Sequence, residues 1–163
     1  MALLHLVRNR AALLKRSGVV AATLVGLALS GCGSDESDLP PDARLQRELG
    51  LEPSDRVHEV LLHGGIEGSV DPAEAVVLQG DYLQFVTADS WVHELIFEVD
   101  SLASPALAFM EGLDQLAAPP MVSRGSRFVL SFVEAPPGRY PFRVEGGGPA
   151  RRGVIVVEPL PAR

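Results

Sequence analysis

The chain has 163 residues, with 14 basic and 21 acidic side chains, a formal charge of −7 and a single cysteine, Cys32. The acidic balance argues against nucleic acid or an anionic bilayer surface as a partner, because both attract clusters of Lys and Arg. One cysteine excludes an intrachain disulfide, so the fold must be held by its hydrophobic core.

The N-terminal segment predicts export. Four basic residues between Arg8 and Arg16 precede an uncharged stretch over 17–31, which is the order of charged and apolar regions in a signal peptide. This stretch is shorter than the roughly 20 apolar residues of a membrane-spanning helix, which favours a cleaved signal peptide over residues 1–31. Cleavage would remove four basic residues and no acidic one, so the charge would fall from −7 to −11.

The signal peptide ends in Leu29-Ser30-Gly31-Cys32, which resembles the lipobox of bacterial lipoproteins. In that family the cysteine is acylated, with palmitate among the acyl groups, and becomes the new N-terminus. The resemblance implies that Cys32 anchors the mature chain to a lipid membrane of the cell envelope. With Gly33 next instead of Asp, it implies the outer membrane, facing the periplasm or the cell surface. The alternative interpretation is that Cys32 is an ordinary small residue that closes a signal peptide.

Residues 32–55 are rich in Ser, Asp, Glu and Pro and predict a lipidated N-terminus followed by a flexible, solvated tether. The stretch from Asp42 to Leu49 could form a short helix. Isolated helices of this length are marginal in water, so we expect this stretch to be mobile or loosely docked.

Residues 56–159 predict one all-β domain, because short runs of Val, Leu, Ile and Phe alternate with Gly, Pro and Asp clusters. Its seven strands, a number typical of a β-sandwich, are expected over 56–63, 73–79, 82–88, 91–99, 126–133, 139–144 and 152–158. The long connection over 101–125 predicts one short helix that caps the core, because its apolar residues recur at helical spacing. The aromatic residues predicted to fill the core between the sheets are Phe85, Trp91, Phe97, Phe128 and Phe132.

Three patterns in their chain order resemble the cupredoxins. Gly80-Asp81 forms a turn between two strands, His93 lies on the next strand, and Pro137-Gly138-Arg139-Tyr140-Pro141-Phe142 leads into the last loop before the closing strand. The resemblance covers about residues 57–158 and implies a Greek-key β-sandwich of cupredoxin type.

Cupredoxins with type 1 copper use two His, one Cys and a weak axial ligand, often Met. Carried over by position, only the first histidine remains, as His93. The resemblance places the other ligand positions at Val144, Gly147 and Arg151, or Arg152 for the last. It therefore implies a degenerate copper site, with no cofactor and no redox activity.

Two other kinds of binding site are compatible with the sequence. Copper or zinc could be held by His93 together with His58 or His63, although a structural role is the more ordinary one for each histidine. The glycine loop 146–148 with Arg151 and Arg152 could bind an anion, or could simply be a flexible surface loop.

The chain shows no motif of a catalytic nucleophile, so we expect no enzyme. The leading hypothesis is a lipid-anchored binding or scaffold module, whose partner is an unknown envelope protein or a small ligand. Metal handling through His93 is the alternative.

Overall fold

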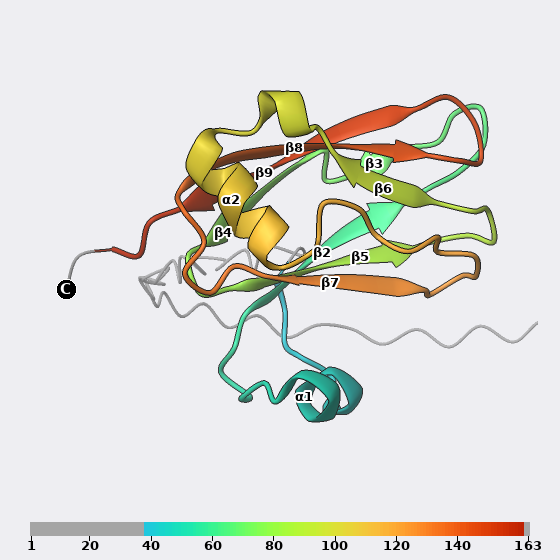
Figure 1. Cartoon of the computed structure of the whole chain (residues 1–163). Coiled ribbons are helices and arrows are strands. Elements are labelled where there is room, and N and C mark those ends of the chain that lie inside the picture. Colours follow the sequence, from blue (N-terminus) through green and yellow to red (C-terminus); the bar gives the residue numbers. More distant parts are fainter. Residues whose placement is uncertain (1–37, 162–163) are drawn as a thin grey trace, which may run out of the picture. The chain divides into compact units, whose positions relative to one another are not determined.

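The computed structural model describes residues 38–161. Two β-sheets pack face to face, and the connections between strands gather at their two ends (Figure 1). The elements in chain order are β1 (Asp38–Leu39), α1 (Ala43–Leu49), β2 (Val57–Leu62), β3 (Val70–Asp71), β4 (Glu74–Leu78), β5 (Tyr82–Thr87), β6 (Glu94–Phe97), the 3-10 turn η1 (Val99–Ser101), α2 (Ser104–Gly112), β7 (Arg127–Ser131), β8 (Gly138–Glu145) and β9 (Arg151–Glu158).

The first sheet has the order β1-β2-β5-β7, with β3 also paired to β2, and the second has the order β4-β9-β8-β6. Parallel pairs, β2 with β5 and β4 with β9, are combined with antiparallel neighbours in both sheets. The predicted all-β sandwich with one short helix in its long connection is thus confirmed. The structure adds β1 and β3, which are two residues each and too short to show a periodic pattern in the sequence.

The core lies between the sheets and is built by alternate residues of each strand, as a pleated backbone requires. Phe85 and Phe142 meet edge to face with ring centroids 5.0 Å apart, and Phe132 and Tyr140 do so at 5.8 Å. The Tyr140 hydroxyl donates a 2.7 Å hydrogen bond to the Pro136 carbonyl. Burial raises the pKa of Tyr140 to about 12.

Of the predicted core aromatics, Phe85, Phe97 and Phe132 are buried and Phe128 is partly buried against the core. Trp91 is the exception: 55% of its surface is exposed, so its assignment to the core was wrong. The expected strand 91–99 begins only at Glu94, which leaves Trp91 in the preceding loop.

Helix α1 packs on the outer face of the first sheet. Its N-terminus is capped by the carboxylate of Asp42, which accepts hydrogen bonds from two backbone amides of the first turn. Leu45 and Leu51 are buried with Val57, against partly buried Tyr82 and Val129. The segment that was expected to be mobile or loosely docked is therefore docked, because Leu45 on the helix and Leu51 just after it find a matching apolar patch on the sheet.

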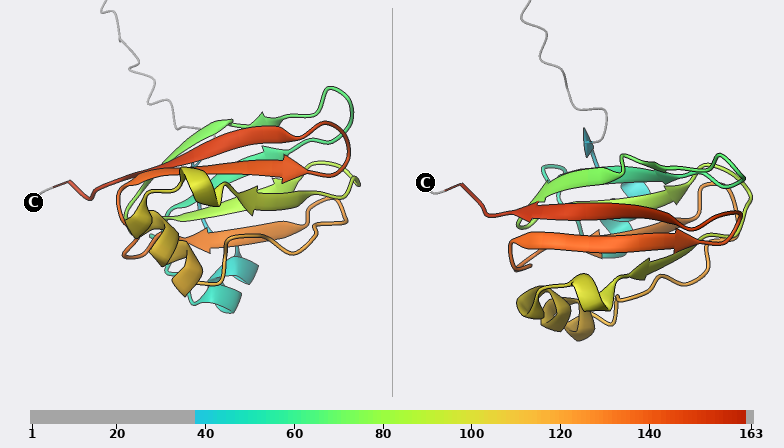
Figure 2. Two further views of the ribbon diagram at one scale, coloured as in Figure 1. Left: turned by 45° about the horizontal axis from the view of Figure 1, so that its top comes forward. Right: turned by 90° about the horizontal axis from the view of Figure 1, so that it is seen from above.

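Helix α2 covers one side of the sandwich (Figure 2), and its Ala106 and Met110 belong to the main core. This agrees with the capping helix expected in the long connection. Within residues 38–161 no helix is long and apolar enough to cross a membrane.

Candidate functional site

His93 is the centre of the candidate site. It lies just before β6, its backbone pairs with that of Met121, and its side chain is completely buried. Nε2 lies 2.9 Å from Oδ1 of Asp89. A carboxylate can only accept, so the proton of this bond is on Nε2. The other ring nitrogen, Nδ1, is buried without a hydrogen-bond partner within the described chain.

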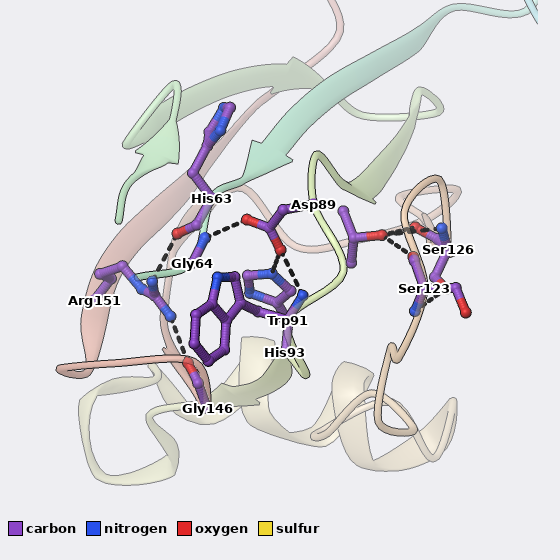
Figure 3. A network of polar contacts seen from close by, with 10 residues as sticks. His63, Gly64, Asp89, Trp91, His93, Ser123, Ser126, Gly146 and Arg151 are labelled. Atoms are coloured by element: carbon purple, nitrogen blue, oxygen red, sulfur yellow. Dashed lines mark hydrogen bonds and ion pairs between the residues drawn. The ribbon is translucent and has the colours of Figure 1, made fainter. Parts of the chain in front are cut away.

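Asp89 connects His93 to two loops (Figure 3). Its carboxylate accepts from the backbone amide of Gly64 at 2.5 Å and from that of Trp91 at 2.9 Å, besides the bond to His93. Burial alone would raise the pKa of Asp89, but these hydrogen bonds from Gly64, His93 and Trp91 outweigh it and lower the pKa from 3.8 to about 2. The ionised carboxylate of Asp89 therefore holds together segments that are far apart in the sequence.

Trp91 and Arg151 close the end of the sandwich beside His93. The indole lies against Gly64, where an added Cβ would come within 2.5 Å of the Trp91 ring, and against Gly147, where it would lie 2.9 Å from Trp91 Cβ. The Arg151 guanidinium donates to the carbonyls of His63 at 2.6 Å and Gly146 at 2.7 Å. Arg151 therefore binds two backbone carbonyls of its own chain at this position.

The other two candidate histidines lie apart from His93. His58 is near the start of β2, where it contacts Asp81 with 2.7 Å between Nε2 and Oδ2. The loop that contacts Asp89 follows the far end of that strand. His63 is closer, but its imidazole points away from Asp89 and His93 (Figure 3). The structure therefore does not bring the three histidines together.

Asp89 was not among the site residues predicted from the sequence. A signal was present, since Asp-Ser-Trp fits an Asx turn in which a carboxylate accepts from the amide two residues on, as Asp89 and Trp91 do. Its bonds to Gly64 and His93 depend on how the strands are arranged.

No protein-family model matches the chain, and no curated protein matches it. Solved structures with a similar backbone do exist. A purple cupredoxin from Nitrosopumilus maritimus is 17% identical over 61% of this chain and 98% of that one, with a TM-score of 0.42. A copper-containing nitrite reductase from Thermus scotoductus SA-01 is 20% identical over 66% of this chain and 23% of that one, with a TM-score of 0.47.

A mutant plastocyanin of fern is 16% identical over 61% of this chain and 99% of that one, with a TM-score of 0.46. Likeness at these identities and TM-scores carries no conclusion about function, because one fold serves many functions. Nothing about metal binding by this chain follows from it.

The residues at this end do not fit type 1 copper. Val144, at the position where the resemblance implies a thiolate, is a fully buried core residue of β8. Gly147 offers no ligand side chain, and the Arg151 guanidinium is a hydrogen-bond donor. Across residues 38–161, no group of three His, Cys, Asp or Glu side chains is arranged to hold a metal ion. Cys32, the predicted lipidation residue, lies outside the described residues.

Proposed function

We propose that this chain is a lipid-anchored cell-envelope protein whose cupredoxin-like domain is a non-enzymatic binding or scaffold module without a type 1 copper centre. The observation that carries the proposal is the set of contacts around His93. Asp89 binds one ring nitrogen, Trp91 and Arg151 close the end of the sandwich, and Val144 fills the thiolate position. A β-sandwich whose end is closed by these side chains is suited to presenting a surface to an envelope protein or a small ligand.

The absence of type 1 copper is tested on the purified mature protein in detergent. Metal analysis and isothermal titration are carried out with Cu(I), Cu(II) and Zn(II) separately. We expect no stoichiometric uptake and no intense thiolate-to-copper absorption band. Stoichiometric copper with that band would contradict the proposal, because it requires a thiolate ligand.

The lipid anchor is tested separately, by mass spectrometry of the N-terminal peptide. We expect the mature chain to begin at Cys32 with a diacylglycerol on sulfur, and the variant Cys32→Ser to be neither modified nor processed. The variant Ser34→Ala serves as the control and should be modified normally. An unmodified thiol at Cys32 in the wild-type chain would refute the anchor.

One observation favours a second function, the handling of copper or zinc. Nδ1 of His93 is buried and has no partner within the described chain, and a neutral imidazole nitrogen is a good ligand for both metals. If this is the function, His93→Ala abolishes tight binding in the titration. His63→Ala is the matched control and should leave binding unchanged, because the His63 ring points away from His93 (Figure 3).

A further inference from the structure

We infer that the end of the sandwich next to His93 rests in the surface of the lipid bilayer that holds the anchored chain. The apolar tip consists of four side chains with large exposed fractions: Ile66 at 92%, Val122 at 59%, Trp91 at 55% and Val92 at 43%. This inference rests on the proposed lipid anchor at Cys32.

The four residues of the apolar tip come together from three loops. Because His93 pairs with Met121 in an antiparallel bridge, Val92 and Val122 lie opposite each other on the same side, facing away from the buried pair. Trp91 packs over Gly64. Ile66 follows in the short loop that His63 and Ser69 close with two backbone hydrogen bonds of 2.9 and 3.0 Å.

The tip is also nearly free of charge. The charged residues of its three loops (63–69, 88–92 and 122–126) are Glu67, Asp89 and Arg124, and the neighbouring loop over 146–150 has none before Arg151. Asp89 is engaged in its three hydrogen bonds and Arg151 in its two, and Glu67 and Arg124 have opposite charges. In a chain with 21 acidic residues, this end can therefore enter the surface of a bilayer with few charged groups to remove from water.

The anchor has the reach that this contact requires. Asp38 pairs with His58 and lies on the tip side of Leu39. From His58 to Gly64 the chain advances about 20 Å at the rise of a β-strand. Cys32 precedes Asp38 by six residues, which span at most about 20 Å when extended. A bilayer that holds a lipid on Cys32 can therefore meet the tip.

The side chains suit the boundary between headgroups and hydrocarbon. Tryptophan is enriched there because its ring is apolar and its indole N–H finds a polar partner. Ile66 and the two valines add apolar surface that an exposed loop does not otherwise need. Their contact would hold the domain in one orientation on the membrane.

Trp91 is the only tryptophan of the chain, so its fluorescence reports directly on the tip. The mature lipidated protein is reconstituted into phosphatidylcholine vesicles, with or without a lipid that carries a nitroxide near the headgroup. We expect Trp91 emission to shift to shorter wavelength, to be quenched by the nitroxide lipid at least twofold, and to be protected from iodide.

Variants that keep Trp91 test the neighbours. Ile66→Ser combined with Val122→Ser should remove at least half of the lipid quenching. Val76→Ser is the matched control, because Val76 is 48% exposed but lies in the middle of β4, away from the loops. In the Val76→Ser variant, the nitroxide lipid should quench Trp91 fluorescence as much as in the wild type.

Three outcomes would overturn the inference in different ways. Protein that floats with the vesicles while Trp91 stays unquenched and open to iodide would refute the tip contact and leave the anchor intact. A blue shift that grows with protein concentration without lipid would assign the tip to a second copy. Wild-type protein that is purified from its host without a lipid on Cys32, and that does not float with the vesicles, would refute the anchor and the inference with it.

Discussion

Replacing Leu45 with Ala should weaken the docking of α1 on the sheet while leaving the sandwich folded. Leu45 is 5% exposed and packs with Leu51 and Val57. The substitution removes three buried carbons, which at about 0.8 kcal/mol each gives about 2 kcal/mol of lost stabilisation. Because a seven-residue helix is marginal alone, this loss falls on the docking of α1.

A loss of about 2 kcal/mol corresponds to a roughly 30-fold larger open population. Native-state hydrogen exchange measures it, since amides that exchange through local opening report the free energy of that opening. The amides of α1 should exchange roughly 30-fold faster in the Leu45→Ala variant. Those of β8 in the core should keep their wild-type rates.

Leu49→Ala is the matched control, because Leu49 lies on the same helix but is 47% exposed. It makes the same chemical change without emptying the contact with the sheet, so its exchange rates should stay close to those of the wild type. Equal effects of the two substitutions would show that α1 is not docked through Leu45, and would refute the reasoning.

Two further predictions concern the loops around His93. The pKa of Asp89 is lowered from 3.8 to about 2, so its carboxylate stabilises the fold above about pH 4 and this contribution is lost as the pH falls toward 2. Asp89→Asn should therefore show a smaller fall in melting temperature between pH 4 and pH 2; an unchanged acid dependence would contradict this. Gly146→Ala should destabilise the protein more than Gly125→Ala in chemical denaturation. Both glycines have a positive φ that costs alanine about 1 kcal/mol, but only at Gly146 would the new Cβ overlap the Val92 carbonyl oxygen, since nothing lies within 4 Å at Gly125. Equal losses of stability in the two variants would show that the loop around Gly146 accommodates the added Cβ without a further free-energy cost.

The strands of the sandwich could be located from the sequence because their signal is local. Alternating apolar residues between glycine, proline and aspartate turns predicted a strand over 82–88 and another over 152–158, and the structure has Tyr82–Thr87 and Arg151–Glu158. The order of such strands was enough to indicate the fold class. The position of α1 was not, because Leu45 and Leu51 pack against residues of β2, β5 and β7.

The exposure of Trp91 could not be predicted from the local sequence. An aromatic residue in an apolar run is usually buried, and the sequence placed this one in the core. In the structure Asp89 holds the loop in a turn through the Trp91 amide, and Gly64 and Gly147 leave room for the ring at the surface. Those contacts join segments that only the folded chain brings together.

The sequence by itself determined the acidic charge of the chain and the all-β fold class, because both depend on residue identity and short-range order. The lipobox-like motif at Cys32 and the missing ligands at Val144 and Gly147 stay predictions. Tertiary structure decided which polar groups meet. His58 finds Asp81 through the parallel register of β2 and β5, and Asp89 reaches His93 and Gly64 at one end of the sandwich. Hydrogen bonds act over a few ångströms in space, and the distance along the chain does not reveal which groups will lie that close.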